Sequence, residues 1–287
     1  MTEGILSPVI AQRHSIPRLW IVYFVAVALT ITQAPGDLKA QSAPRDTGNV
    51  PLVRSRDALA ALGVAAVSVG VSAFDERLAR SFQRPSVQSN GSLKAAANVF
   101  NAIGFPGSIV MIAGTYFFGI AEHSRRIASL GMHAGEAVVL GGILAEGLQM
   151  SIGRARPQRD IRRAFDFRVG HGFSDEDYTS LPSAHVTVAF AAATAASREV
   201  SMSWPGAAKY VTPVTYSLAS LVGLSRIYKN KHWGSDVVAA AGLGTYSGLL
   251  FERYNEGHPH NIFNRLFLPS SIVSQGRGIA VAWSLER

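Results

Sequence analysis

Six apolar stretches, each long enough for a helix, follow one another along most of this chain. Polar segments rich in Gly, Pro and Arg separate them, which is the pattern of helices joined by loops. The stretches cover residues 57–74, 95–121, 132–152, 183–198, 208–227 and 235–252. The sequence therefore predicts an all-α protein built as a six-helix bundle.

The composition favours a bundle that is associated with a membrane. Apolar residues make up 48% of the chain and charged residues only 16%, a balance typical of membrane proteins or tightly packed helical proteins. Glu136 and Glu146 both fall inside the third stretch, and an ionisable residue in a membrane span usually faces the bundle interior. Pro106 and Gly107 are expected to kink the second stretch. A soluble periplasmic bundle is the alternative.

The N-terminus carries a targeting signal. Arg13 and Arg18 precede a largely apolar run at 19–32, and small residues that a signal peptidase would accept follow near residues 40–43. Residues 1–40 are therefore interpreted as a secretory signal peptide, with an uncleaved anchor helix as the alternative.

The remaining boundaries follow from composition. Residues 41–56 are polar and punctuated by Pro and Gly, so they are assigned as a linker to the helical domain at 57–255. Residues 256–287 form a C-terminal appendage, whose alternating apolar residues from Ile279 onward indicate a short extended tail. No second strand to pair with it is evident from the sequence.

Charge and cysteine content narrow the function classes. The net charge of +8 suits an anionic membrane surface or a phosphorylated substrate as partner. Nucleic acid is not expected, because the basic residues are scattered and no series of aromatic residues for base stacking runs through them. The chain has no cysteine, which excludes disulfides, thiol catalysis and cysteine-based zinc sites. The oligomeric state cannot be inferred.

Three short segments differ from the helical background: residues 153–157 (GRARP), residues 181–185 (LPSAH) and residues 225–236, which run from Ser-Arg to a His and an Asp. They close the third helix, open the fourth, and join the fifth to the sixth. In an up-and-down bundle these three points lie at the same end. The segments are therefore expected to form one site.

The residue types in this site suit a tetrahedral oxyanion. Guanidinium groups bind phosphate oxygens with paired donors, and Ser183 with the N-terminus of the fourth helix adds neutral donors. His232 and Asp236 are spaced i, i+4, so on a helix the carboxylate could hold one imidazole nitrogen protonated while the other attacks. His185 could then protonate the leaving oxygen.

These segments resemble the three signature motifs of the type 2 phosphatidic acid phosphatases, Lys-x6-Arg-Pro, Pro-Ser-Gly-His and Ser-Arg-x5-His-x3-Asp. Here they appear, over a resemblance spanning about 95–252, as Gln149-x6-Arg156-Pro157, Pro182-Ser183-Ala184-His185 and Ser225-Arg226-x5-His232-x3-Asp236. The resemblance implies a cofactor-free phosphatase without metal that works through a phosphohistidine. By carry-over, His232 is the nucleophile, Asp236 orients it and His185 is the acid and base.

The phosphate ligands implied by the resemblance are Arg156, Ser183 and Arg226, with Gln149 and Ala184 at motif positions and Arg154 as an additional candidate. Two departures from the motifs stand out. Gln149 replaces a lysine and removes a charge, for which Arg154, Lys229 or Lys231 could compensate. Ala184 replaces a glycine, and this change is expected to be mild if the residue lies in the first helical turn.

The family acts on phosphatidic acid, diacylglycerol pyrophosphate, undecaprenyl pyrophosphate and similar esters, so a phospholipid or polyprenyl phosphate is the expected substrate. Vanadium haloperoxidases share the three motifs, and a non-catalytic envelope protein with the same bundle is a further alternative. The expected location is the cell envelope, with the site facing the periplasm or exterior. The positive-inside rule favours a cytoplasmic position for Arg125 and Arg126, between the second and third stretches. An outward-facing site and cytoplasmic arginines are both possible if stretch 57–74 does not cross the membrane.

Overall fold

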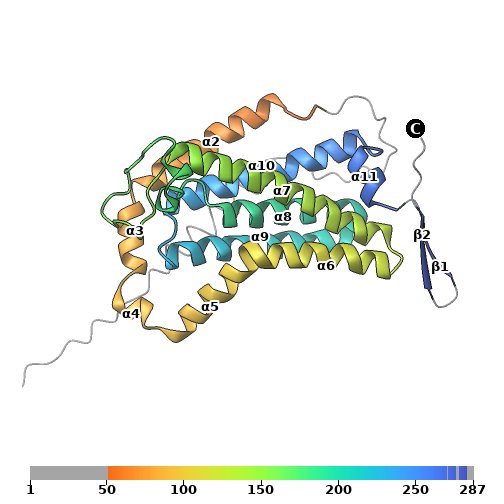
Figure 1. The fold of residues 1–287 in the computed structure, drawn as a ribbon, viewed down its shortest axis with the longest axis horizontal. Coiled ribbons are helices and arrows are strands. Elements are labelled where there is room, and N and C mark those ends of the chain that lie inside the picture. Colours follow the sequence, from red (N-terminus) through yellow and green to blue (C-terminus); the bar gives the residue numbers. More distant parts are fainter. Residues whose placement is uncertain (1–50, 270, 276–277, 283–287) are drawn as a thin grey trace, which may run out of the picture.

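The computed structural model describes residues 51–269, 271–275 and 278–282, and in this part of the chain the prediction of six long helical segments is confirmed (Figure 1). The long helices are α2 (Ser55–Ser72), α5 (Gly91–Ala102) with α6 (Ser108–Ala121), α7 (Arg125–Ile152), α8 (Ala184–Ser203), α9 (Pro205–Tyr228) and α10 (Gly234–Gly257). The shorter helices are α3 (Asp75–Phe82), α4 (Pro85–Gln88), α11 (Ile262–Phe267), and the 3-10 turns η2 (His171–Phe173) and η3 (Glu176–Tyr178). The fold class is all-α.

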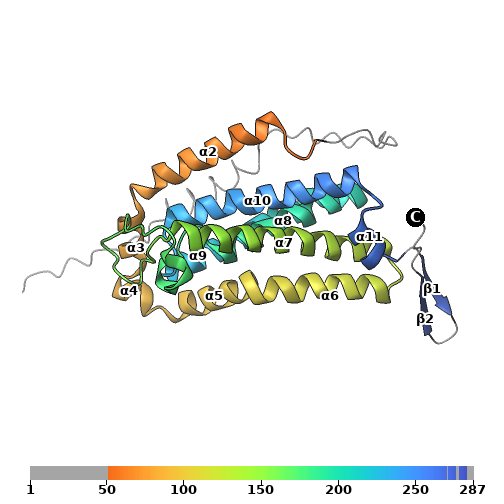
Figure 2. The ribbon, with the colours of Figure 1, turned by 45° about the horizontal axis from the view of Figure 1, so that its top comes forward.

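Helix α8 forms the centre of the bundle, where it packs against α7, α9 and α10 (Figure 2). Most of its residues are buried, and its apolar side chains join those of α9 and α10 in one core cluster around Phe190, Tyr216 and Val237. Small residues allow α8 and α10 to approach closely. A Cβ added at Gly244 of α10 would lie 2.2 Å from the carbonyl oxygen of Thr187.

The second apolar stretch bends where Pro106 was expected to bend it. A π-helical turn, η1 (Ile103–Gly107), joins α5 to α6 and contains Pro106. A proline cannot donate the helical hydrogen bond and its ring clashes with the preceding turn, so the helix widens there. The bend brings Gly104 next to His185. A Cβ added at Gly104 would lie 3.4 Å from the imidazole ring.

The outer faces of the bundle are apolar, as a lipid environment requires. Exposed large side chains include Val110 and Phe117 of α6, Ile143 of α7 and Val214 of α9. Within the described residues, three helical segments are long and apolar enough to cross a membrane: Ser55–Ser72, Gly91–Ala121 and Arg125–Ile152. Helix α2 was expected not to cross, yet it meets this criterion and lies along α10 with none of its residues buried.

The chain ends need one correction. The tail was expected to hold a lone extended strand, but β1 (Ser271–Gln275) pairs antiparallel with β2 (Gly278–Ala282) to form a hairpin. The sequence signal was present, since two short runs are separated by Gly276 and Arg277. The signal peptide or anchor assigned to 1–40 lies outside the described residues, as does the linker 41–56 before residue 51.

Candidate active site

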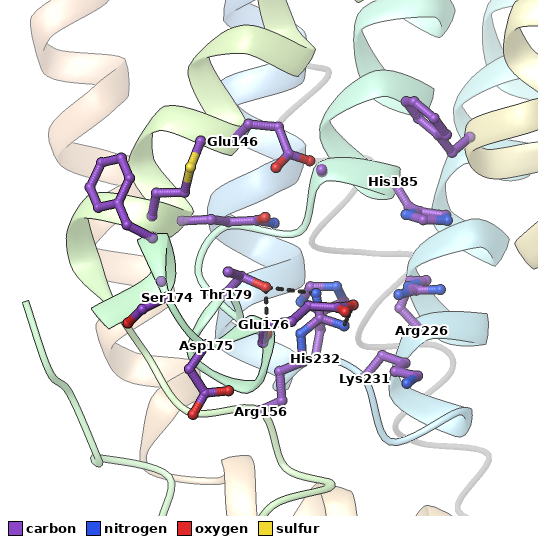
Figure 3. Close-up of a pocket in the computed structure, with 16 residues that line it drawn as sticks. Glu146, Arg156, Ser174, Asp175, Glu176, Thr179, His185, Arg226, Lys231 and His232 are labelled. Atoms are coloured by element: carbon purple, nitrogen blue, oxygen red, sulfur yellow. Dashed lines mark hydrogen bonds and ion pairs between the residues drawn. The ribbon is translucent and has the colours of Figure 1, made fainter. Parts of the chain in front are cut away.

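The three motif segments meet at one end of the bundle, around a cavity of about 640 Å³ (Figure 3). Its lining includes Gln149, Arg156, Ala184, His185, Arg226 and His232 from the motifs. The loop between α7 and α8, which holds η2 and η3, adds further walls, including Asp175, Glu176 and Thr179. In Figure 3, His232 lies centrally, with Arg156 and Arg226 on different sides of it and His185 above. The expected convergence of the motifs is therefore observed.

His232 presents one defined nitrogen to this cavity. The residue is buried, and its Nδ1 lies 2.7 Å from the backbone oxygen of Ser180. A carbonyl can only accept, so Nδ1 must carry the proton and Nε2 keeps a free electron pair. Burial, followed by the charges of Arg226 and Arg156, lowers the pKa of His232 well below its ordinary value. The imidazole is thus neutral and suited to nucleophilic attack.

His185 occupies the second position of α8 and is also neutral. Burial, then Arg226, then Arg156, lowers the pKa of His185 to about 3. A phosphate dianion between the two guanidiniums would cancel their charge and raise this pKa again. His185 can therefore gain a proton when an anionic substrate binds, as a general acid must.

Several buried donors in this region have no partner among the described residues. They are the Nε groups of Arg156 and Arg226 and the hydroxyl of Ser183. Ser183 is the N-cap residue of α8, yet its side chain makes no capping hydrogen bond. Burying such donors unsatisfied costs about 1–3 kcal/mol each, so their accumulation beside one helix N-terminus indicates an anion site.

The remaining hydrogen bonds of the two arginines fix their orientation. Arg156 donates from Nη2 to Thr179 at 2.8 Å, and Arg226 donates from Nη1 to the side-chain oxygen of Asn101. Burial, followed by repulsion from Arg156, lowers the pKa of Arg226 to about 10, which still leaves it protonated at neutral pH. Both guanidiniums therefore carry their charge in the cavity.

The two departures from the family motifs have different structural settings. Ala184 is the first residue of α8 and does not adopt a positive φ, so the expectation of a mild change is supported. Gln149 lines the cavity, but its amide donates to the backbone oxygen of Pro182. Gln149 thus holds the loop before α8. Lys231, one of the proposed compensating cations, also lines the cavity.

The expected direct contact between Asp236 and His232 is wrong. Helix α10 begins at Gly234, so His232 precedes the helix and the i, i+4 geometry does not apply. Asp236 instead accepts from the Ser180 hydroxyl at 2.5 Å and from the backbone N–H of Trp233 at 2.9 Å. Asp236 thereby fixes Ser180, and the Ser180 carbonyl orients His232. Asp236 therefore affects the orientation of His232 through Ser180 and not by direct contact.

The expectation that Arg154 binds phosphate is also corrected. Arg154 is buried away from the cavity lining, and its guanidinium bonds to Asp236 at 2.5 Å, to Asp75 at 2.8 Å and to Ser235 at 2.7 Å. Its Nε and Nη2 also donate to the carbonyl of Ala164. No donor of this guanidinium is directed at the cavity. Arg154 ties the α7–α8 loop to the start of α10.

Sequence reasoning missed Asp75, Ser180 and Asn101. Asp75 opens α3, is fully buried and accepts from the backbone of Ser235 at 2.9 Å as well as from Arg154. A short amphipathic segment after the first apolar stretch gives no reason to single out one aspartate. Ser180 could have been noticed, since it stands two residues before Pro182 of the second motif.

Comparison with known proteins agrees with the motif pattern. The family model described as "PAP2 superfamily" matches residues 130–257. A lipid A 1-phosphatase of Porphyromonas gingivalis is 33% identical over 112 residues, which is 39% of this chain and 20% of that protein. The chain thus matches only about a fifth of the length of this relative.

A solved structure described as the first transmembrane PAP2-type phosphatidylglycerolphosphate phosphatase, from Bacillus subtilis, is similar with a TM-score of 0.48. It is 21% identical, and the similarity covers 72% of this chain and 97% of that one. The family match spans α8, α9 and α10 with most of α7, and therefore every motif described above. Residues 130–257 of this chain thus match the PAP2 superfamily, and this segment holds all the motif residues of the site.

Proposed function

We propose that this protein is a phosphatase that hydrolyses lipid phosphate or polyprenyl pyrophosphate esters through a phosphohistidine intermediate, without a metal ion in the reaction. The observation that carries the proposal is the neutral His232, whose Nε2 keeps a free electron pair. His232 lines the same cavity as Arg156 and Arg226, whose buried Nε donors have no partner among the described residues. This combination supplies a nucleophile and a positive oxyanion site together.

In the first step, Nε2 of His232 attacks phosphorus, and the bond from phosphorus to the leaving oxygen breaks. Arg156, Arg226 and Ser183 hold the three non-bridging oxygens, so their positive charge and donors stabilise the transition state. The leaving oxygen takes a proton from His185, whose imidazolium forms when the substrate dianion offsets the arginines. The products of this step are phospho-His232 and the dephosphorylated lipid or its monophosphate.

In the second step, water attacks the phosphohistidine. His185, now neutral, accepts a proton from that water, and the P–N bond to His232 breaks to release inorganic phosphate. The hydrogen bond from Nδ1 to Ser180 persists through both steps, so His232 returns to the same tautomer. His185 is protonated again and ready for the next cycle.

The nature of the leaving group follows from the surroundings of the cavity. The bundle exposes large apolar side chains on α6, α7 and α9, and three helical segments suit a membrane span. A substrate with its phosphate at the bilayer surface and its chains in the lipid would reach a cavity at the helix ends. The family relatives named for lipid A and phosphatidylglycerolphosphate are consistent with this class. We place the site on the outer face of the membrane.

Lys231 is proposed to supply the charge that Gln149 lacks. It lines the cavity directly after the turn that ends α9, next to His232 in sequence. Glu146, Asp175 and Glu176 line the same cavity, so its rim carries both signs of charge. Lys231 is the cation best situated to attract a second phosphate group.

Phosphate release by the purified full chain in detergent with EDTA tests the proposal. Phosphatidic acid and undecaprenyl pyrophosphate are the substrates, and His232→Ala is the matched variant. Release that survives EDTA and disappears in the variant supports the proposal. Vanadate-dependent bromination would instead identify a haloperoxidase, and the absence of both activities in folded protein would leave a non-catalytic binding protein.

A further inference from the structure

A second polar cluster lies near the other end of the bundle. It consists of His133 on α7, Glu199 on α8 and Glu252 on α10, and one potential ligand atom from each lies within 4.8 Å of the other two. His185 and Glu199 are fourteen residues apart on α8, which corresponds to about 21 Å along a helix. The cluster is therefore remote from the phosphate cavity and is not used in the proposed reaction.

The imidazole of His133 faces oxygen atoms on both sides. Its Nδ1 lies 3.0 Å from Oε2 of Glu199, and its Nε2 lies 3.2 Å from Oδ1 of Asn264 in α11. The amide of Asn264 is oriented by its own donation to the Pro259 carbonyl. Nε2 thus carries a proton and donates it to Asn264. A histidine held in this way on its far nitrogen presents the other nitrogen as a metal ligand.

Glu252 supplies the second observation. Its side chain is 1% exposed, and its Oε1 has no hydrogen-bond partner in the part of the chain that the structure describes. A buried carboxylate oxygen without a donor is costly unless a cation or a proton satisfies it. The nearby Arg198 is directed toward Glu256, at 3.5 Å. Among the described residues, no ion pair joins Glu252 to an arginine or a lysine.

The charges of the three residues match a divalent cation. A metal ion would displace the proton through which Nδ1 of His133 contacts Glu199. The two carboxylates and the neutral imidazole then carry a charge of −2, which a divalent ion cancels. An imidazole nitrogen together with carboxylate oxygens favours a transition-metal ion such as Zn²⁺ or Co²⁺ over Mg²⁺ or Ca²⁺, which prefer oxygen ligands alone. A bond to Nδ1 of His133 would replace the short contact between that nitrogen and Glu199.

We propose that His133, Glu199 and Glu252 form a binding site for a divalent transition-metal ion, with Zn²⁺ as the representative ion. The site ties α7, α8 and α10 together at the end of the bundle opposite the phosphate cavity. Through Asn264 it also fastens α11, which packs there by a hydrogen bond from Tyr116 to the Phe267 carbonyl. The ion stabilises the fold and takes no part in phosphate hydrolysis.

The test uses the full chain, purified in detergent and treated with EDTA before the chelator is removed. A titration with ZnCl₂ alone, monitored by calorimetry, should show one ion bound per chain. Thermal unfolding with bound Zn²⁺ should show a higher melting temperature than without it. Glu252→Gln keeps the shape of the side chain but removes a ligand charge, and it should weaken Zn²⁺ binding at least about tenfold. Co²⁺ bound to the unmodified chain should show visible absorption from nitrogen and oxygen ligands.

A control variant separates this site from surface binding. His258 is exposed near the end of α10 and contacts Tyr254 rather than the cluster, so His258→Asn should bind Zn²⁺ like the unmodified chain. If Glu252→Gln does not fold, Glu199→Gln takes its place in the comparison. The proposal is overturned if the chain binds no stoichiometric Zn²⁺, which would mean that His133 is simply an imidazolium paired with Glu199. Equal binding by the Glu252 variant or loss of binding in the His258 variant would overturn it as well.

Discussion

The hydrogen bond between Nδ1 of His232 and the Ser180 carbonyl makes the position of one loop decisive for the nucleophile. That loop is held by side chains on either side of it. Asp236 accepts from the Ser180 hydroxyl, and Gln149 donates to the Pro182 carbonyl. The motif residues therefore act partly on the backbone of the site and not only on the substrate.

Ser180→Ala tests this positioning role. The change removes the hydroxyl that Asp236 binds but keeps the carbonyl that orients His232, so the loop becomes less constrained. We expect kcat to fall about tenfold or more, by analogy with the loss of groups that orient active-site ligands, while KM changes little. Steady-state kinetics measures both constants. Ser174→Ala, at an exposed position on the cavity rim, is the control and should keep the kcat of the unmodified chain. An unchanged kcat in Ser180→Ala would contradict the positioning role of Ser180.

Arg154→Lys distinguishes a structural from a substrate-binding arginine. Lysine keeps the charge but cannot bridge Asp75, Asp236 and Ser235 at the same time, and a buried charge pair that loses one partner costs about 3–5 kcal/mol. We expect a lower melting temperature and an unchanged KM in the protein that remains folded. A raised KM without loss of stability would show instead that Arg154 contacts the phosphate.

His185 gives a pH dependence with a defined sign. Its folded pKa of about 3 lies below the ordinary value of 6.5, so the unfolded chain binds more protons between these values. The stability that His185 contributes is therefore present above about pH 6.5 and is lost progressively as the pH falls towards 3. Melting temperatures over this range should fall less steeply in His185→Gln, whose side chain does not titrate. Parallel curves would contradict the assignment.

The helices show which interactions can be predicted from a pattern. Apolar periodicity predicted the six long helices, and Pro106 predicted the bend at η1. The start of the sixth stretch was predicted at residue 235, and α10 begins at Gly234. The i, i+4 argument nevertheless treated His232 as helical, although it lies before that start. The i, i+4 argument failed because Trp233 is the N-cap and Asp236 caps that first turn.

Gly244→Ala tests the close packing of α8 and α10. The added Cβ would meet the Thr187 carbonyl at 2.2 Å, so the helices must separate, with an expected loss of about 1–3 kcal/mol. Gly147→Ala is the matched control, because no atom lies within 4 Å of a Cβ there, and it should keep or raise stability. Thermal unfolding in detergent measures both, and equal stability of the two variants would contradict this packing argument.

Across the whole molecule, local motifs were easier to predict than the contacts that support them. The expected up-and-down topology alone predicted that the motif residues meet at one end of the bundle. These residues are Arg156, Ser183, His185, Arg226 and His232. The roles of Arg154 and Asp75 depend on α3 crossing the start of α10, a long-range contact that no periodicity encodes. The hairpin of β1 and β2 was missed because only its second strand was considered.

The central claim at this scale is that phosphate passes through His232. Brief incubation of the full chain with phosphatidic acid labelled in its phosphate should give a phosphoenzyme that is stable in alkali and labile in acid, with the label on the peptide that contains His232. His232→Ala should carry no label. A labelled residue other than His232, or phosphate release by the His232→Ala variant at the unmodified rate, would contradict the account.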